Sequence, residues 1–191
     1  MKIVGIIGFD RCGKDTLADI IKYIINKRTD KRVCKRSFGA YVKHSVSAVL
    51  NIPYWQLDKF KNENKIIEVG DFKGTMRDFI IDYSEHMKSK YGKSVWIEPL
   101  FRDSENIDII IIPDIRFVAE YEYLLDNYKD NLVLIDMVST LESCGSNGKI
   151  YEIPDILGRH DFKLEKFLVK EKENKKQTAL RLSRIMRKIL L

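Results

Sequence analysis

The chain has 191 residues, of which 45% are hydrophobic, and its formal net charge is +6. This length suits one ordinary domain with a substantial core, and no apolar run approaches the roughly 20 residues that a membrane-spanning helix needs. The positive excess lies in residues 170–188, where eight bases accompany two acids. Because the rest of the chain is balanced and no recognition motif accompanies this stretch, we expect no nucleic-acid partner.

The three cysteines and three histidines are scattered without metal-ligand spacing, so we expect no zinc site. The first residues carry no secretory signal. We therefore expect a cytoplasmic protein, in the host cytoplasm if it is viral, that has no contact with a membrane.

An apolar run at residues 2–8 predicts a first strand, and residues 14–26 carry apolar side chains at helical spacing. The connecting segment reads Gly8-Phe9-Asp10-Arg11-Cys12-Gly13-Lys14-Asp15-Thr16. A strand, then Gly-x4-Gly-Lys, then a helix is the order typical of a phosphate-binding P-loop. The glycines let backbone N–H groups curl around an anion, which the N-terminus of the helix also attracts.

Three residues of this loop carry the match and its one departure. Lys14 has the length to reach the outer phosphates of a nucleotide. Asp15 stands where the motif has Ser or Thr, and Thr16 follows one position late. A glycine-rich turn with a solvated lysine is the structural alternative. The strand and helix on either side favour the P-loop.

The middle of the chain predicts mostly helices. Residues 32–38 predict a second strand, and residues 40–50 predict a helix. The polar residues 54–72 predict a short helix followed by a mobile excursion. Residues 75–89 predict a helix with Thr75 as its N-cap.

The second half of the chain alternates strands and helices. Its predicted elements are a helical piece at 95–101, a strand at 107–113, a helix at 119–128, a strand at 132–137, a loop at 139–155, a short strand at 167–169 and an amphipathic helix at 177–191. Four consecutive isoleucines in the strand at 107–113 suit the centre of a parallel sheet. The alternation predicts a three-layer α/β domain whose ligands gather at the carboxyl ends of the strands.

Asp114 and Arg116 directly follow the isoleucine strand. A carboxylate at this edge can hold Mg²⁺ and its waters, and an arginine two residues later can clamp a phosphate. An ordinary helix N-cap is the alternative role for Asp114.

Two basic residues in the middle of the chain are further candidates. Arg77 lies in the first turn of a predicted helix, where its charge opposes the helix dipole, and an anionic ligand would remove that penalty. Lys43 follows the second strand, a place where small-molecule kinases often bind their acceptor. For both residues a solvated surface position is the alternative.

Taken together, three motifs carry a resemblance to a known family. They are Gly13-Lys14-Asp15-Thr16, the helix Met76-Arg77-x-x-x-Ile81-x-Tyr83-Ser84-Glu85 with Trp96 to Phe101 after it, and Ile112-Pro113-Asp114-Ile115-Arg116 with Glu120 nearby. From Lys2 to about Met137 the chain resembles the bacteriophage-type deoxynucleoside monophosphate kinases. The resemblance implies a three-layer α/β/α P-loop NTPase fold with a mostly parallel five-stranded sheet, like that of nucleoside monophosphate kinases.

The resemblance also implies transfer of the γ-phosphoryl group of ATP to a deoxynucleoside monophosphate, with Mg²⁺. The residues expected to take part directly are Lys14, Arg77, Asp114 and Arg116. The expected ATP-binding residues are Gly8, Asp10, Arg11, Cys12, Gly13, Lys14, Asp15 and Thr16. Asp15, Thr16 and Asp114 are expected to hold the metal, and Lys43, Arg77, Tyr83, Arg116 and Glu120 to bind the acceptor.

A single kinase domain over residues 1–191 is expected, with an acceptor-binding helical part at about 39–101 and a lid or loop at about 138–160. The lid as far as residue 155 has no arginine, so Lys149, Arg159 or Arg116 would have to supply its positive charge. The animal phosphomevalonate kinases share the Gly-Lys-Asp loop and the strand–Asp–x–Arg element, so a phosphomevalonate-type or other small-molecule P-loop kinase remains an alternative. A P-loop nucleotide-binding switch or nucleic-acid-associated protein is the alternative of another class. A homodimer is left open.

Overall fold

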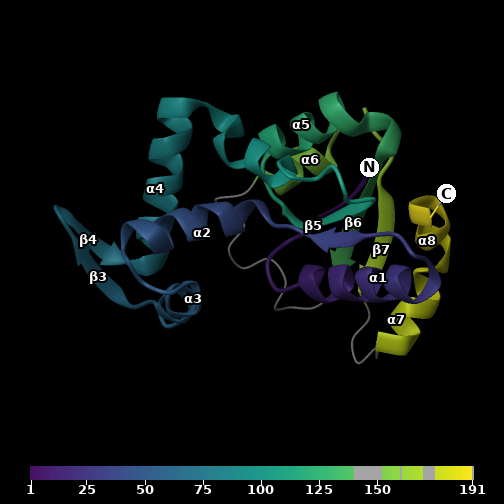
Figure 1. Cartoon of the computed structure of the whole chain (residues 1–191), viewed down its shortest axis with the longest axis horizontal. Helices are drawn as coiled ribbons and strands as arrows, with labels where there is room; N and C mark the ends of the chain where they lie inside the picture. The colour runs from purple at the N-terminus through teal and green to yellow at the C-terminus, as the bar shows by residue number, and fades with distance from the viewer. Residues whose placement is uncertain (140–151, 160, 170–174, 191) are drawn as a thin grey trace. The chain divides into compact units, whose positions relative to one another are not determined.

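The computed structural model describes residues 1–139, 152–159, 161–169 and 175–190. The chain divides into two compact units (Figure 1). We call Met1–Ser37 with Asp103–Leu191 the sheet unit, and Phe38–Arg102 the helical unit. Within the described ranges, no helix combines the length and the apolar character that crossing a membrane requires.

Five parallel strands form the sheet of the sheet unit, in the order β2-β5-β1-β6-β7 among the described residues. They are β1 (Lys2–Ile7), β2 (Val33–Lys35), β5 (Ile109–Ile115), β6 (Leu132–Ser139) and β7 (Glu165–Val169). Because all five run in one direction, their carboxyl ends share one edge of the sheet. The expected α/β P-loop NTPase fold with a parallel five-stranded sheet is confirmed.

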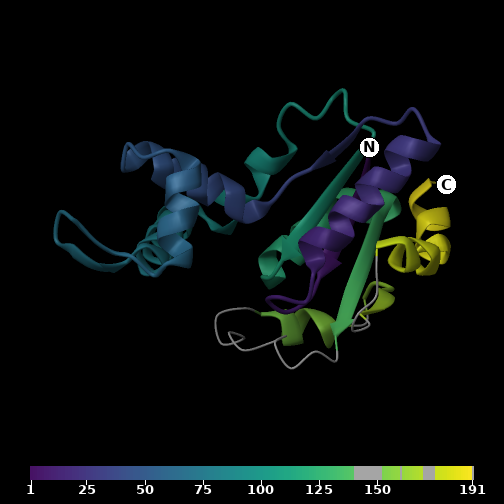
Figure 2. The ribbon, with the colours of Figure 1, turned by 90° about the horizontal axis from the view of Figure 1, so that it is seen from below.

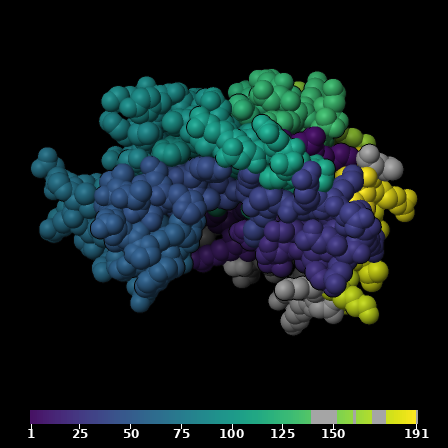
Figure 3. Space-filling model, in the orientation of Figure 1, coloured from purple at the N-terminus to yellow at the C-terminus, as the bar shows by residue number. Residues whose placement is uncertain are grey.

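Helices cover both faces of this sheet and complete the three predicted layers (Figures 1 and 2). On one face lie α1 (Lys14–Arg28), α7 (Lys175–Arg181) and α8 (Ser183–Leu190), whose surfaces adjoin one another in Figure 3. On the other lie α5 (Val118–Tyr128), the 3₁₀ turn η3 (Lys129–Asn131) and α6 (Ile153–Leu157).

The side chains of β1 show how the layers are filled. Val4 and Ile6 belong to one apolar cluster with the α1 residue Ile21. Ile3 and Ile7 are also fully buried, and strand alternation directs them to the opposite face. Burial on both faces explains why this strand reads as a continuous apolar run.

The structure corrects three boundaries in the sheet unit. β5 continues through Pro113 and Asp114 to Ile115, two residues beyond the strand expected at 107–113. The single helix expected at 177–191 is interrupted at Leu182, which is fully buried between α7 and α8. The expected loop at 139–155 already contains the start of α6, because buried Ile153 and Ile156 anchor that helix.

The helical unit contains α2 (Phe38–Val49), α3 (Tyr54–Asn62), β3 (Ile66–Val69), β4 (Phe72–Thr75), α4 (Met76–Tyr91) and the 3₁₀ turns η1 (Lys93–Trp96) and η2 (Glu98–Phe101). Its apolar cluster is formed by Val46, Leu57, Met76 and Phe79. α2, α3 and α4 therefore share one small core of their own.

The mobile excursion expected after the short helix is wrong, because β3 and β4 pair there as an antiparallel hairpin. Gly70 supplies the positive φ of 56° at its two-residue turn. The strands have only four residues each, too few for a clear alternating pattern. Thr75 is confirmed as the N-cap of α4: its hydroxyl accepts from the Asp78 N–H at 3.1 Å, and Asp78 accepts from the Thr75 N–H at 3.1 Å.

Candidate functional site

The loop between β1 and α1 has the backbone of an anion cradle. Gly13, with φ of 86°, and Arg11, with φ of 61°, both adopt left-handed conformations. Lys14 begins α1 directly after them. At Gly8 a Cβ would lie 3.0 Å from Cys12 Sγ and 3.1 Å from Met137 Cβ, so the loop passes too close to β6 for a side chain. Steric constraints therefore explain why both motif positions, 8 and 13, are occupied by glycine.

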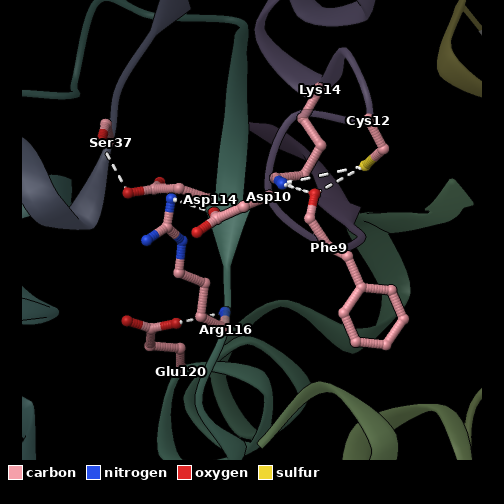
Figure 4. Close-up of polar contacts among 8 residues, drawn as sticks. All are labelled: Phe9, Asp10, Cys12, Lys14, Ser37, Asp114, Arg116 and Glu120. Carbon is pink, nitrogen blue, oxygen red and sulfur yellow. Dashed lines mark hydrogen bonds and ion pairs between the residues drawn. The ribbon is translucent and has the colours of Figure 1, made fainter. Parts of the chain in front are cut away.

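The Lys14 side chain is buried in this loop, with 6% of its surface exposed. Its Nζ donates to the Phe9 carbonyl at 2.5 Å and lies 3.9 Å from Cys12 Sγ (Figure 4). Cys12 Sγ donates to the same carbonyl at 2.7 Å. The ammonium is thus held against the loop, and the alternative of a solvated lysine is wrong.

A pocket of about 260 Å³ opens beside the loop. It is lined by Asp10, Arg11, Gly13, Lys14, Asp15, Pro113, Asp114 and Arg116. The lining joins the P-loop to the end of β5 because β1 and β5 are neighbours, with Ile7 opposite Ile115. The predicted convergence of these two segments at the carboxyl edge is confirmed.

Asp114 lies within β5 and faces the pocket. Its Oδ2 accepts a hydrogen bond from Ser37 Oγ at 2.6 Å. The alternative role of helix N-cap is wrong, because α5 begins at Val118 and Phe117 occupies its N-cap position. The Asp114 carboxylate therefore lines the pocket and does not cap a helix.

Arg116 extends from the turn after β5 toward the Asp10 and Asp114 carboxylates (Figure 4). Its Nη2 lies 3.4 Å from Asp10 Oδ1. Its backbone N–H donates to Glu120 Oε2 at 2.7 Å. The guanidinium therefore lines the pocket, and the backbone of Arg116 is bound to a side chain in the first turn of α5.

Glu120 is directed into the protein, with 8% of its surface exposed. Its Oε2 also accepts from the Phe117 N–H at 3.0 Å. Burial, and next the nearby charge of Asp114, raise the pKa of Glu120 to about 8. A carboxyl group bound to two backbone amides organises the turn, and its expected contact with the acceptor stays a prediction.

Lys35 and Ser37 are two site residues that sequence reasoning missed. Lys35 Nζ lies 2.7 Å from Asp19 Oδ1 and 3.5 Å from Asp15 Oδ1. Ser37 holds Asp114. Their position in the sequence could have identified them. Lys35 ends the second strand and Ser37 follows it, at the edge of the sheet where ligands of parallel sheets bind.

The two loop residues expected to hold metal differ in position. Asp15 lines the pocket, and its side chain is 80% exposed. Thr16 is exposed and is not among the residues that line the pocket. Asp15 and Asp114 therefore line the pocket and Thr16 does not, and the metal roles of all three residues stay predictions.

The other acceptor candidates lie in the helical unit. Lys43 Nζ binds Asp58 at 2.9 Å and lies 4.9 Å from the centre of the Tyr54 ring. Tyr83 Oη is 2.7 Å from Ser45 Oγ. Arg77 is half-buried in the first turn of α4. These contacts are internal to the helical unit, so the acceptor roles of the three residues stay predictions.

The expected lid falls mostly outside the described residues, which resume at 152. Lys149 lies outside them. Arg159 is described, and its Nη2 binds Glu122 on α5 at 2.9 Å. Arg159, one of the candidates for the positive charge of the lid, is therefore paired with a residue of α5.

No family model and no curated protein matches the chain. Over 99% of its length it is similar to 95% of a gluconokinase from Sinorhizobium meliloti 1021, with a TM-score of 0.42 and 8% sequence identity. Over 95% of its length it is similar to 91% of a sugar kinase from Janibacter sp. HTCC2649, with a TM-score of 0.40 and 9% identity. Likenesses this remote do not bear on substrate, and the fold stands on the strand order and the loop.

Proposed function

We propose that this chain is an ATP-dependent phosphotransferase whose acceptor is a deoxynucleoside monophosphate. One observation carries the proposal: the P-loop lysine, the Asp114 carboxylate and the Arg116 guanidinium line a single pocket. Cations for phosphate and carboxylates for a metal are the two requirements of phosphoryl transfer. The presence of both cationic and anionic side chains in one pocket supports phosphoryl transfer over simple anion binding.

The residues present fit ATP with Mg²⁺. The left-handed turns at Arg11 and Gly13 and the start of α1 at Lys14 make a concave backbone that suits a phosphate. Asp15 and Asp114 provide the hard oxygen ligands that Mg²⁺ prefers. When bound, Mg²⁺ supplies neutralisation of the charge on the phosphate oxygens.

Two residues of the pocket, and Ser37 beside it, have distinct tasks in this proposal. Lys14 exchanges its bond to the Phe9 carbonyl for the outer phosphates of ATP. Arg116 neutralises the group in transfer or clamps the acceptor phosphate. Ser37 keeps Asp114 oriented through its 2.6 Å hydrogen bond. The attacking phosphate oxygen is already an anion, so the site needs no general base.

The nature of the acceptor rests on the resemblance to deoxynucleoside monophosphate kinases. Arg77, Tyr83 and Lys43 are proposed to bind it. A phosphomevalonate-type kinase would need cationic clamps of the same kind, whereas a nucleobase also needs stacking and hydrogen-bonding groups. Comparing the activity on a panel of acceptors therefore distinguishes a deoxynucleoside monophosphate kinase from a phosphomevalonate-type kinase.

The test is coupled ADP release with the four deoxynucleoside monophosphates, the ribonucleoside monophosphates and phosphomevalonate. We expect one or a few deoxynucleoside monophosphates to give the highest kcat/KM. Preference for phosphomevalonate would replace the acceptor and keep the reaction class. Nucleotide binding without turnover of any acceptor, together with steeply salt-dependent DNA binding, would favour the switch or nucleic-acid-associated alternative.

A further inference from the structure

The turn from Arg116 to Val118, which carries the pocket arginine, is held by two glutamate side chains. Glu120 comes from the first turn of α5, and Glu152 directly precedes α6. Glu120 Oε2 accepts from the N–H groups of Arg116 and Phe117, at 2.7 Å and 3.0 Å. This half of the arrangement is local, because only four residues separate the arginine from its partner.

Glu152 supplies the other half from a distant part of the chain. Its Oε2 accepts from the Val118 N–H at 2.7 Å. Its own N–H donates to the Arg116 carbonyl at 2.9 Å. Glu152 thus binds the turn at both Val118 and Arg116, although it lies 34 residues along the chain from Val118.

The two glutamates together define the conformation of the turn. Three successive N–H groups, those of Arg116, Phe117 and Val118, donate to glutamate side-chain oxygens. The Arg116 carbonyl is also bound. With the backbone on both sides of the arginine fixed, the direction in which its side chain leaves the turn is fixed as well.

We propose that Glu152 is a positioning residue for Arg116, holding the turn so that the guanidinium stays over the pocket, 3.4 Å from Asp10. The proposal rests on the phosphotransferase function proposed above, and it assigns a role in that function to the segment at α6. Glu152 is itself exposed, so its bonds serve orientation more than the burial of apolar surface.

The chain offers a matched contrast between positioning and simple docking of α6. Tyr121 Oη donates to Asp161 Oδ1 at 2.7 Å, which also ties α5 to the segment that follows α6. This bond does not touch the 116–118 turn. If Glu152 only docked α6, the loss of either tie would have a similar effect on turnover.

The test is a double-mutant cycle of Glu152→Ala with Arg116→Ala, with Glu152→Gln and Tyr121→Phe as companions. We expect Glu152→Ala to lower kcat roughly tenfold. Glu152→Gln should retain most of the activity, because its amide oxygen still accepts a hydrogen bond from the Val118 N–H. Tyr121→Phe should retain full activity. In the Arg116→Ala background, Glu152→Ala should cost nothing further. Amide hydrogen exchange at Val118 should accelerate in Glu152→Ala and not in Tyr121→Phe.

An equal loss in both arginine backgrounds, an equal loss in Tyr121→Phe, or unchanged kcat in Glu152→Ala would overturn the positioning role. A wild-type chain that turns over none of the acceptors would overturn the proposed function instead. In that case the same cycle is measured on the affinity for a fluorescent ATP analogue, where coupling between positions 152 and 116 supports the role and its absence refutes it.

Discussion

The Lys35 ammonium lies 3.5 Å from the Asp15 carboxylate, so the acid that departs from the P-loop pattern has a cation beside it. An acidic side chain in the first turn of α1 suits the helix dipole, but it would repel the phosphates of a nucleotide. Hydrogen bonds and charges from Asp19 and Asp15 outweigh desolvation and raise the pKa of Lys35, which keeps it charged. Lys35 therefore balances the charge of the aspartate beside the proposed phosphate site.

Replacing Lys35 with methionine should raise the KM for ATP roughly three- to tenfold, with little change in kcat, because Asp15 then faces the phosphates unneutralised. Steady-state kinetics at low ionic strength measure this. Lys27→Met removes the same charge from the last turn of α1 and should have no effect. Because Asp15 is also a proposed Mg²⁺ ligand, the rescue is measured as ATP binding without Mg²⁺, where adding Asp15→Asn to Lys35→Met should restore part of the affinity. A double variant no better than Lys35→Met would contradict the explanation.

Replacing Lys14 with alanine should lower turnover by roughly 10³-fold or more, because the cation nearest the outer phosphates is lost. The fold should survive, since the α1 core residues Leu17 and Ile21 are untouched. Circular dichroism and thermal unfolding check the second expectation. Substantial activity in a folded variant would rule out the P-loop assignment.

Replacing Arg77 with alanine should raise the acceptor KM or lower kcat roughly tenfold while leaving the KM for ATP nearly unchanged. The reason is its proposed contact with the acceptor phosphate. Lys73→Ala, on the neighbouring hairpin and paired with Glu68, is the control for loss of one charge. A parallel loss of ATP affinity would move Arg77 out of the acceptor site.

The free energy of unfolding should depend on pH through Glu120. Burial and Asp114 raise its pKa from 4.5 to about 8, while the Arg116 charge and the two backbone N–H groups oppose this. The folded state therefore binds the proton more tightly than the unfolded state does. The contribution of Glu120 to the free energy of unfolding is fully present below about pH 4.5 and declines as the pH rises toward 8, by an amount on the order of 1–4 kcal/mol.

Denaturant unfolding at several pH values without Mg²⁺ measures this dependence. In Glu120→Gln the amide mimics the protonated carboxyl group, so the decline between pH 4.5 and 8 should flatten relative to the wild type. The difference between the two proteins isolates Glu120 from other groups that titrate. Parallel curves would show that this carboxyl group does not hold its proton in the folded state.

Much of this protein follows from short stretches of sequence. The P-loop lies within nine consecutive residues, Gly8 to Thr16, between a strand and a helix whose periodicities are clear. The Thr75 cap of α4 is likewise predicted from Thr75 and Asp78, which lie three residues apart. Such features are determined by contacts between near neighbours, and so the sequence alone predicts them.

Other features depended on tertiary structure. The strand order places Ser37 beside Asp114, which lies 77 residues away, and Glu152 reaches Val118 across 34. No local pattern marks these pairs, because a side chain finds a distant partner only after the strands have paired and the helices have packed. Local sequence motifs are enough to indicate which residues can bind phosphate. The packing of the sheet decided which side chains hold them in place, since a direction in space is set by contacts from outside the local segment.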